Sequence, residues 1–198
     1  MTTTTNGGQP KVKSPQHLAH VLLKTTRLDE MIDFYVKLLG GKVAFRNKYM
    51  AFVAYDDEHH RIAIGALPHT GPPSPHASGL EHIAFTYDTL DDLVLSYEQR
   101  KKLGMNPVWC VNHGPTTSIY YEDPDGNHLE MQVDNFDTAD EATAYMMSAE
   151  FDEEPIGYDF QPEELIARLQ SGEDHKSIKR RRGSGGRKHP PYSQPVHI

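Results

Sequence analysis

The chain has 198 residues and a formal net charge of −8, which suits one domain with tails or two very small ones. Hydrophobic residues make up 37% and charged residues 24%, as in a soluble globular protein. No apolar stretch approaches the roughly 20 residues of a membrane-spanning helix, and the N-terminus carries no apolar segment typical of a signal peptide. We therefore expect a cytoplasmic protein with no membrane partner. The single cysteine, Cys110, excludes an internal disulfide and cysteine metal clusters, so any metal must be held by His and carboxylates.

An internal repeat organises residues 17–135. The segment that begins at Leu18 realigns on Leu80, an offset of 62 residues that places His20 on His82. Each copy predicts a strand, a helix and three further strands. In the first copy these are a strand at 20–23, a helix through 31–38 and strands at 42–46, 50–55 and 61–67. In the second copy they are a strand at 82–85, a helix through 93–97 and strands at 107–111, 117–121 and 128–133.

The repeat predicts an α+β fold of two tandem βαβββ modules, 17–70 and 78–135. Neither module could bury both faces of its own sheet, so we expect the two to form one curved eight-stranded sheet around a metal cleft. A proline-rich linker joins them, with Pro72, Pro73 and Pro75. Matching positions of the two copies should face each other across the cleft, and His20 and His82 are such a pair.

The ends of the chain differ in charge from the modules. Residues 1–16 are expected to be a disordered tail. Residues 136–174 form an acidic arm, with 12 acids against Arg168 alone, and contain two helix-like pieces at 140–147 and 161–169. We expect this arm to pack along the sheet or across a second subunit, covering Met146, Met147 and Phe151 and so supporting a homodimer. The alternative is that it covers only its own chain.

Residues 175–198 reverse the sign of the charge, with seven Lys or Arg and no acid. The basic run at 179–182 is followed by a glycine-rich stretch, which predicts a flexible tail. Nucleic-acid binding or a nuclear address is the alternative, but a short solvated run of this kind is more often plain disorder. We assign it no function and expect no nucleic-acid partner.

Three residues of the repeats suggest a metal centre. His20 and His82 stand at the same point of the two copies, and Glu130 is a charged residue amid apolar neighbours in the last predicted strand. Burying a carboxylate is costly unless it is paired or binds a metal. Two neutral imidazoles and one carboxylate directed into one cleft form the facial triad that leaves positions open on iron(II) for substrate and oxygen.

Residues 113–130 carry the most specific pattern of the chain. They read HGPTTSIYYEDPDGNHLE and combine His113, an aliphatic residue before Tyr120, an acid–proline turn with Gly126, and Glu130. In these residues the chain resembles the type I extradiol ring-cleavage dioxygenases of the vicinal-oxygen-chelate (glyoxalase/bleomycin-resistance/dioxygenase) superfamily. The resemblance covers about residues 17–135.

The resemblance implies roles for individual residues. It makes His20, His82 and Glu130 the iron(II) ligands, and His113 and Tyr120 the groups that hydrogen-bond the substrate or bound oxygen. The acid–base histidine of the family precedes the last strand of the first module, and we place it on His60, with His59 as the second choice.

The implied activity is iron-dependent opening of a catechol ring by O2, with both oxygen atoms incorporated, as in aromatic hydrocarbon catabolism. The sequence leaves open the natural catechol and whether manganese replaces iron.

Two other functions remain open on the same scaffold. A glyoxalase- or epimerase-like enzyme generally has a fourth ligand on the last strand of the first module, where residues 61–66 contain no acid. A non-catalytic small-molecule-binding protein usually lacks the metal triad. Iron content, followed by absorbance on adding catechols, separates the three hypotheses.

Overall fold

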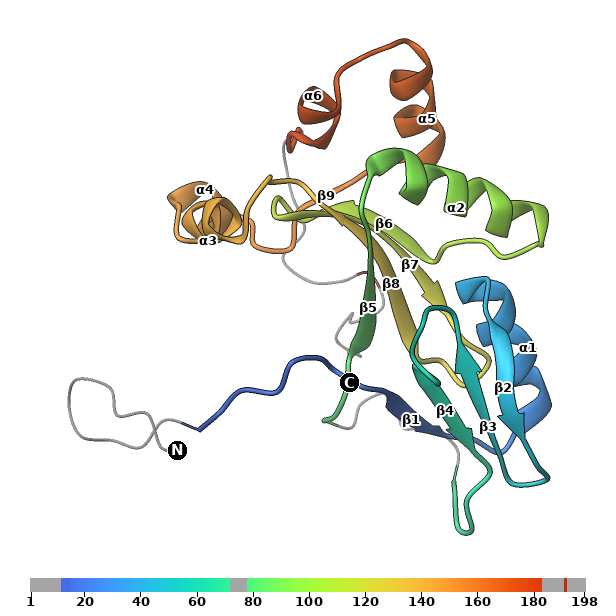
Figure 1. Cartoon of the computed structure of the whole chain (residues 1–198). Coiled ribbons are helices and arrows are strands. Elements are labelled where there is room, and N and C mark those ends of the chain that lie inside the picture. Colours follow the sequence, from blue (N-terminus) through green and yellow to red (C-terminus); the bar gives the residue numbers. More distant parts are fainter. Residues whose placement is uncertain (1–11, 72–77, 183–190, 192–198) are drawn as a thin grey trace, which may run out of the picture. The chain divides into compact units, whose positions relative to one another are not determined.

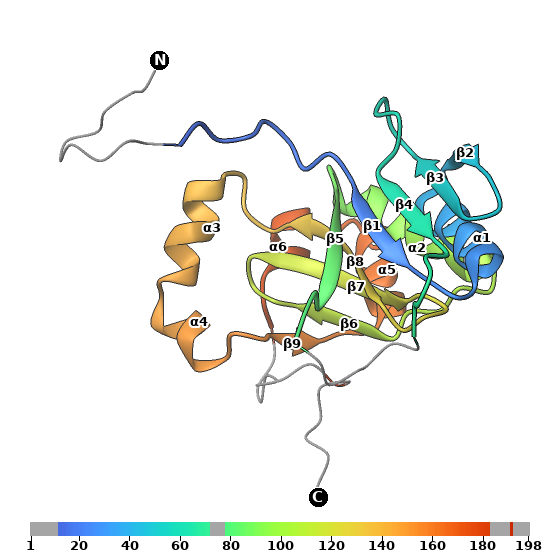
Figure 2. The same cartoon turned by 90° about the horizontal axis from the view of Figure 1, so that it is seen from below.

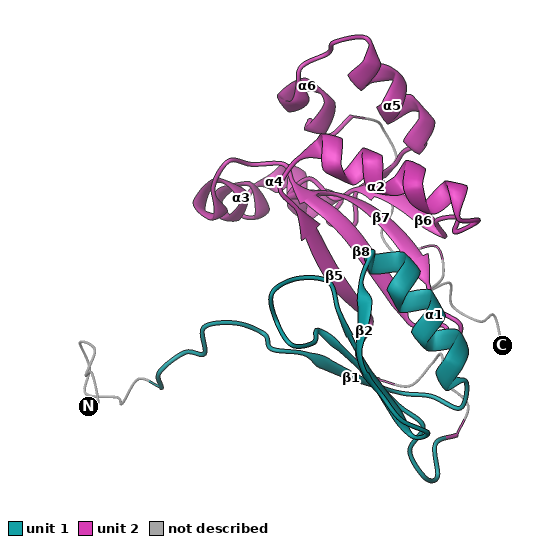
Figure 3. Ribbon diagram, turned by 45° about the vertical axis from the view of Figure 1, so that its right-hand side comes forward, with its two compact units in different colours: residues 1–70 teal, residues 71–198 magenta. Residues whose placement is uncertain are grey.

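The computed structural model describes residues 12–71, 78–182 and 191, and it divides into two compact units, 1–70 and 71–198 (Figure 3). The predicted linker prolines lie outside the described residues, as does most of the predicted N-terminal tail. Among the described residues, no helix has the length and apolar character needed to cross a bilayer.

Unit 1 is the first predicted βαβββ module. It contains β1 (Val21–Lys24), α1 (Leu28–Leu39), β2 (Lys42–Arg46), β3 (Met50–Ala54) and β4 (Ile62–Gly65). The sheet order is β1-β4-β3-β2, with β1 parallel to β4 and the other pairs antiparallel (Figure 1). The first strand begins at Val21, one residue later than predicted, so His20 directly precedes it.

The helix of unit 1 forms because its apolar residues share one face. Met31, Tyr35 and Leu38 recur at helical spacing and are fully buried, and α1 packs against β3 and β4. Strand side chains alternate between the two faces of a sheet, so every second residue of these strands points away from α1. Two of these, Leu22 and Phe45, are about half exposed.

Unit 2 begins with the second module. It contains β5 (His82–Tyr87), α2 (Leu90–Lys102), β6 (Trp109–Asn112), β7 (Thr116–Glu122) and β8 (His128–Asp134). Thr89 caps α2 by accepting a hydrogen bond from the Asp92 amide. Leu93 and Tyr97 of this helix are buried on the apolar face of the sheet. The tandem modules and the α+β class are therefore confirmed.

The strand pairing differs from the prediction in one respect. The described strands form two hydrogen-bonded sheets, of four and five strands, in place of one eight-stranded sheet. The reason is that the first strand of each module pairs in parallel with the last strand of the same module, which completes each ladder locally. The fifth strand of the second sheet, β9 (Tyr158–Asp159), comes from the acidic arm and pairs with β6.

The arm also supplies three helices to unit 2, α3 (Ala139–Met146), α4 (Ala149–Glu153) and α5 (Pro162–Gln170), and the basic segment after it supplies α6 (His175–Lys179) (Figure 2). The two predicted helical pieces correspond to α3 and α5. Helix α5 packs against α2, where Glu163 accepts hydrogen bonds from Lys101 and Tyr97 at 2.6 and 2.5 Å. The bond from Lys101, then that from Tyr97, lowers the pKa of Glu163 to about 2.

Two observations bear on the expectations for the C-terminal region. Met146 and Met147 are 41% and 84% exposed, so the described residues of this chain do not cover them, and their covering by a second subunit stays a prediction. The expected start of the flexible tail falls on α6, whose Ile178 is 2% exposed. Ile178 anchors this basic segment on unit 2 together with polar contacts, among them the hydrogen bond of 2.8 Å that Asn112 donates to the Lys179 carbonyl oxygen. Of the rest of the tail, only 180–182 and 191 are described.

Candidate metal centre and its surroundings

One face of the unit 2 sheet is lined by site residues. In the strand register Trp109 lies opposite Tyr120, Tyr120 opposite Glu130, and Glu130 opposite Ala84. His82 precedes Ala84 by two residues on the same strand, and alternate residues of a strand share a face. Local strand pairing therefore places these side chains in one row, on the face away from the apolar contacts of α2.

The centre of this row is a buried ion pair. Glu130 is only 4% exposed, and its Oε2 lies 3.0 Å from Nε2 of His82. Burial acts to raise the pKa of Glu130, but hydrogen bonds from His82 and Ser118 outweigh it, so the pKa lies below its ordinary value. The bond to Glu130, with a further one to Glu81, raises the pKa of His82 to about 9 against the effect of burial. The Glu130 carboxylate thus stays charged because a positive charge lies beside it. Here that charge is the proton on His82, and a metal ion bound between the two side chains would serve equally.

His113 and Tyr120 adjoin the pair. Nε2 of His113 lies 3.0 Å from the Tyr120 hydroxyl and 3.9 Å from Oε1 of Glu130. Nδ1 of His113 lies 2.5 Å from the carbonyl oxygen of Ile156, which can only accept, so Nδ1 carries the proton. Burial lowers the pKa of His113 and favours the neutral ring. Nε2 of the neutral ring then accepts a hydrogen bond from the Tyr120 hydroxyl.

The acidic arm fixes this arrangement from outside the repeat. Besides the Ile156 carbonyl it provides Asp159, whose Oδ1 accepts a hydrogen bond of 2.9 Å from the Trp109 indole. Trp109 in turn stacks on Tyr120, with ring centroids 4.9 Å apart. Sequence reasoning missed Ile156 and Asp159, because a backbone carbonyl has no residue-specific signal and Asp159 is one of many acids in the arm.

Two glycines allow the arm to approach the His113 loop. Gly157 has φ of +105°, and a Cβ there would lie 2.1 Å from the carbonyl oxygen of Asn112. Gly114 has φ of +101°, and a Cβ there would lie 2.4 Å from the ring of Tyr145 on α3. A side chain at 157 would therefore collide with backbone, whereas one at 114 would have to displace the Tyr145 ring. Gly157, an isolated glycine in a highly charged segment, was the one signal in the sequence for the contact between the arm and the His113 loop.

In unit 1 the structure brings His20 and His60 together. Their ring centroids are 4.5 Å apart, and His60 also stacks on Phe52 at 4.3 Å. His60 is 7% exposed, whereas the side chain of the adjacent His59 is 73% exposed. Burial, and then the neighbouring His59 and His20, lower the pKa of His60.

The predicted site residues thus form two groups. Unit 2 holds His82, Glu130, His113 and Tyr120 in mutual contact, and unit 1 holds His20 beside His60. Among the described residues, no three His, Cys, Asp or Glu side chains gather as a metal-binding group. His82 and Glu130 still fit a divalent ion, because they supply a nitrogen and a buried carboxylate oxygen 3.0 Å apart.

Comparison with known proteins assigns the family. Residues 17–131 match the model of the Glyoxalase/Bleomycin resistance protein/Dioxygenase superfamily. The chain belongs to this superfamily. Within it, the chain is 44% identical over 155 residues to biphenyl-2,3-diol 1,2-dioxygenase 2 of Rhodococcus globerulus, covering 78% of this chain and 82% of that protein.

Two further relatives show the range of the superfamily. Biphenyl-2,3-diol 1,2-dioxygenase 3 of the same organism is 43% identical over 157 residues, covering 78% of this chain and 83% of that protein. A lactoylglutathione lyase of Neisseria meningitidis is 32% identical over 124 residues, covering 57% of this chain and 87% of that protein. The similarity to the two dioxygenases extends further along this chain than the similarity to the lyase.

Proposed function

We propose that this protein is an iron(II)-dependent extradiol dioxygenase, which opens the ring of an aromatic diol beside its two adjacent hydroxyls. The observation that carries the proposal is the buried Glu130 carboxylate, paired with His82 and bordered by Tyr120 and His113. The two dioxygenases that are 44% and 43% identical to the chain act, by their names, on biphenyl-2,3-diol. Their similarity supports an aromatic diol and O2 as the substrates and aromatic catabolism as the setting.

The metal ligands in this proposal are His20, His82 and Glu130. His82 and Glu130 have the donor atoms and burial described above, and His20 occupies in the first repeat the position that His82 holds in the second. Two imidazoles and one carboxylate suit iron(II) and also accept manganese. When bound, the metal would bind the oxygens of the diol and pass charge between the diol and O2.

Tyr120 and His113 would act on the oxygen atoms of the substrate. The Tyr120 hydroxyl is a donor that can turn from His113 to an oxygen where negative charge develops. His113, with its proton held on Nδ1 by the Ile156 carbonyl, offers Nε2 as an acceptor for a diol hydroxyl. Trp109 supports this pair by stacking on the Tyr120 ring.

His60 is our choice for the acid–base residue. Its burial beside His20 and against Phe52 supports this choice, because a proton-transfer group must be held in position. The ring of His59 is largely exposed, which makes it the weaker candidate. His60 would take a proton from the diol and return it later in the reaction.

The strand register argues against the glyoxalase-like alternative. Glu130 lies opposite Ala84, and the repeat offset of 62 residues aligns Ala84 with Leu22. Leu22 lies opposite Ala63, so Ala63 is the first-module counterpart of Glu130. An alanine cannot supply the fourth ligand that such enzymes generally have at this position.

The test is metal content followed by turnover. Protein purified without oxygen should contain close to one iron per chain, and it should convert biphenyl-2,3-diol or catechol to a yellow ring-opened acid with uptake of one O2. His82→Ala should lose both the iron and the yellow product. A metal-free protein that binds catechols without converting them would favour the non-catalytic alternative, and isomerisation of a glutathione hemithioacetal would favour the glyoxalase-like enzyme.

We also propose a homodimer in the cytoplasm, with no membrane or nucleic-acid partner. The neighbouring Met146 and Met147, 41% and 84% exposed on the arm, are the apolar side chains that a second subunit would cover in this proposal. Sedimentation should show a dimer for the full chain and a monomer for Met147→Glu. A monomeric parent chain would refute the dimer.

A further inference from the structure

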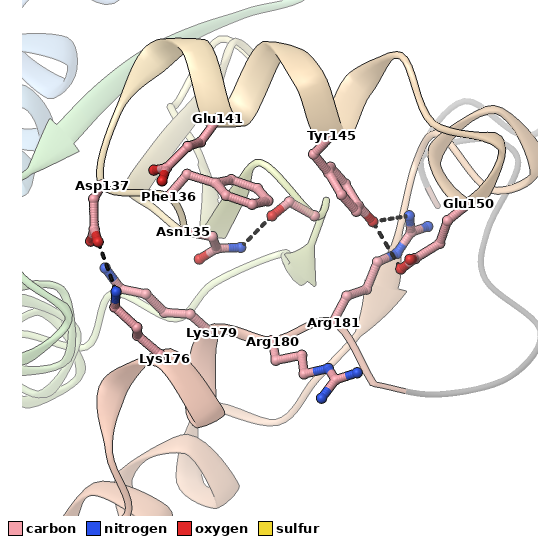
Figure 4. A pocket seen from close by; sticks show the side chains of 11 residues that line it. Asn135, Phe136, Asp137, Glu141, Tyr145, Glu150, Lys176, Lys179, Arg180 and Arg181 are labelled. Atoms are coloured by element: carbon pink, nitrogen blue, oxygen red, sulfur yellow. Dashed lines mark hydrogen bonds and ion pairs between the residues drawn. The ribbon is translucent and has the colours of Figure 1, made fainter.

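A cavity lies in unit 2 next to Gly114, the residue that follows His113. It has a volume of about 440 Å³ and lies between α3 and the segment that runs from α6 to residue 181 (Figure 4). This volume is in the range of small-molecule sites. None of the metal-centre residues named above lines it.

The cavity is lined by more positive than negative side chains. Four cations, Lys176, Lys179, Arg180 and Arg181, meet three carboxylates. The carboxylates are already engaged. Asp137 pairs with Lys176 at 2.8 Å, Glu141 accepts from the Thr138 amide, and Glu150 accepts from the Tyr145 hydroxyl.

Several of the cations have neutral partners. Lys179 donates to the carbonyl oxygen of Asp134 at 2.7 Å, and Arg181 donates to the Tyr145 hydroxyl at 3.0 Å and to the Glu154 carbonyl. Arg180 is exposed at the edge of the cavity and, among the described residues, no side-chain partner contacts it. The lining thus carries a net charge of +1, and the ion pairs among the described residues leave Lys179, Arg180 and Arg181 without a carboxylate partner, in a chain whose net charge is −8.

The inner wall of the cavity is aromatic. Phe136 and Tyr145 extend into the space beneath α3, with ring centroids 5.3 Å apart (Figure 4). A flat apolar body can pack on these rings, while the planar guanidinium of Arg180 matches a carboxylate through two parallel hydrogen bonds. We propose that this cavity binds a small aromatic or conjugated carboxylate.

The cavity is connected to the His113 loop. Gly114 lines it, and the side-chain amide of Asn135, also in the lining, donates to the Gly114 carbonyl at 2.8 Å. The lining of the cavity thus includes the residue that directly follows His113. The product of ring cleavage is itself a conjugated carboxylate, so the cavity would bind the product class; this last step rests on the proposed function.

The test measures benzoate binding by calorimetry on the full chain, freed of metal so that benzoate cannot bind at the iron. We expect saturable binding of benzoate, weakened about 10-fold or more in Arg180→Gln. The matched control is Lys102→Gln, which removes one exposed positive charge from the end of α2 and should leave the affinity unchanged. Phe136→Leu keeps the carboxylate contacts and should weaken benzoate while leaving acetate unaffected. Thermal unfolding of each variant verifies that it is folded.

Three results would overturn the proposal: no saturable benzoate binding to the parent chain, equal affinity in Arg180→Gln and Lys102→Gln, or inorganic phosphate binding more tightly than benzoate. None of these measurements depends on turnover. Failure of the ring-cleavage assay would therefore leave the binding result intact, and failure of binding would leave the proposed function intact.

Discussion

Gly157→Ala should damage both stability and turnover, because residue 157 is where the arm presses on the His113 loop. An added Cβ would lie 2.1 Å from the Asn112 carbonyl oxygen and 2.8 Å from Cα of His113. The arm would have to withdraw by about 1 Å or more to reach an ordinary contact of ~3.5 Å. That movement removes the Ile156 carbonyl from Nδ1 of His113 and opens the short pairing of β9 with β6.

The size of the effect follows from these contacts. Alanine at φ of +105° costs about 1–3 kcal/mol in backbone strain, and each hydrogen bond lost costs about 1 kcal/mol net. We expect Gly157→Ala to lower the free energy of unfolding by about 3 kcal/mol. Since a misplacement of about 1 Å can cost about 10²-fold in rate, kcat/KM for the diol should fall by up to that factor.

Gly172→Ala provides the matched control. Gly172 also has a positive φ, +78°, but a Cβ there would meet nothing within 4 Å. It should therefore show the backbone strain alone, about 1 kcal/mol in urea unfolding, with unchanged turnover. If the two variants lost equal stability and both kept full kcat/KM, the contact between the arm and the His113 loop would be irrelevant to the site.

Glu130→Gln keeps the size of the side chain but removes its charge, so iron measured after purification should fall well below one per chain; stoichiometric iron would contradict the ligand assignment. His60→Phe should retain iron and bind catechol but turn over about 10²-fold more slowly, whereas His59→Phe, at an exposed position, should turn over at nearly the parent's rate. The reverse result would move the acid–base role to His59. Because Lys101 holds the pKa of Glu163 near 2, the stability from this pair is complete above pH ~4.5 and declines as the pH falls toward 2. Glu163→Gln should weaken this dependence of the free energy of unfolding on pH, by no more than about 1 kcal/mol because the side chain is half exposed. If the unfolding of this variant depended on pH as that of the parent does, the pair would contribute nothing.

The module order could be predicted because periodicity is a local signal. Met31, Tyr35 and Leu38 mark a helix whatever lies around them, and the repeat supplied every element twice. The division into two sheets could not be predicted, because it depends on which distant strand each edge meets. The two-residue strand β9 has no alternation to detect. Helix α6 is held by Ile178 and by polar contacts with residues far away in the sequence, such as Lys179 with the Asp134 carbonyl, which leave no local pattern.

The candidate site could be predicted as far as side-chain chemistry carries information. Glu130 was conspicuous because a carboxylate amid apolar residues needs a partner, and the structure shows it buried beside His82. Ile156 could not be found in the same way, since its contribution is a carbonyl group that every residue has. The sequence favoured His60 over His59, and the different burial of these two adjacent rings, which the sequence does not show, supports the same order.

The dependence of His113 on Ile156 and Gly157 limits how this protein can be shortened or recombined. The family match ends at residue 131, about 25 residues before that contact. A chimera that joins residues 17–135 to a foreign C-terminus would keep the residues proposed to bind metal, yet leave Nδ1 of His113 without the Ile156 carbonyl and the outer edge of β6 without β9. The smallest transplantable catalytic unit of this chain is therefore longer than the region that matches the family and extends at least to Asp159.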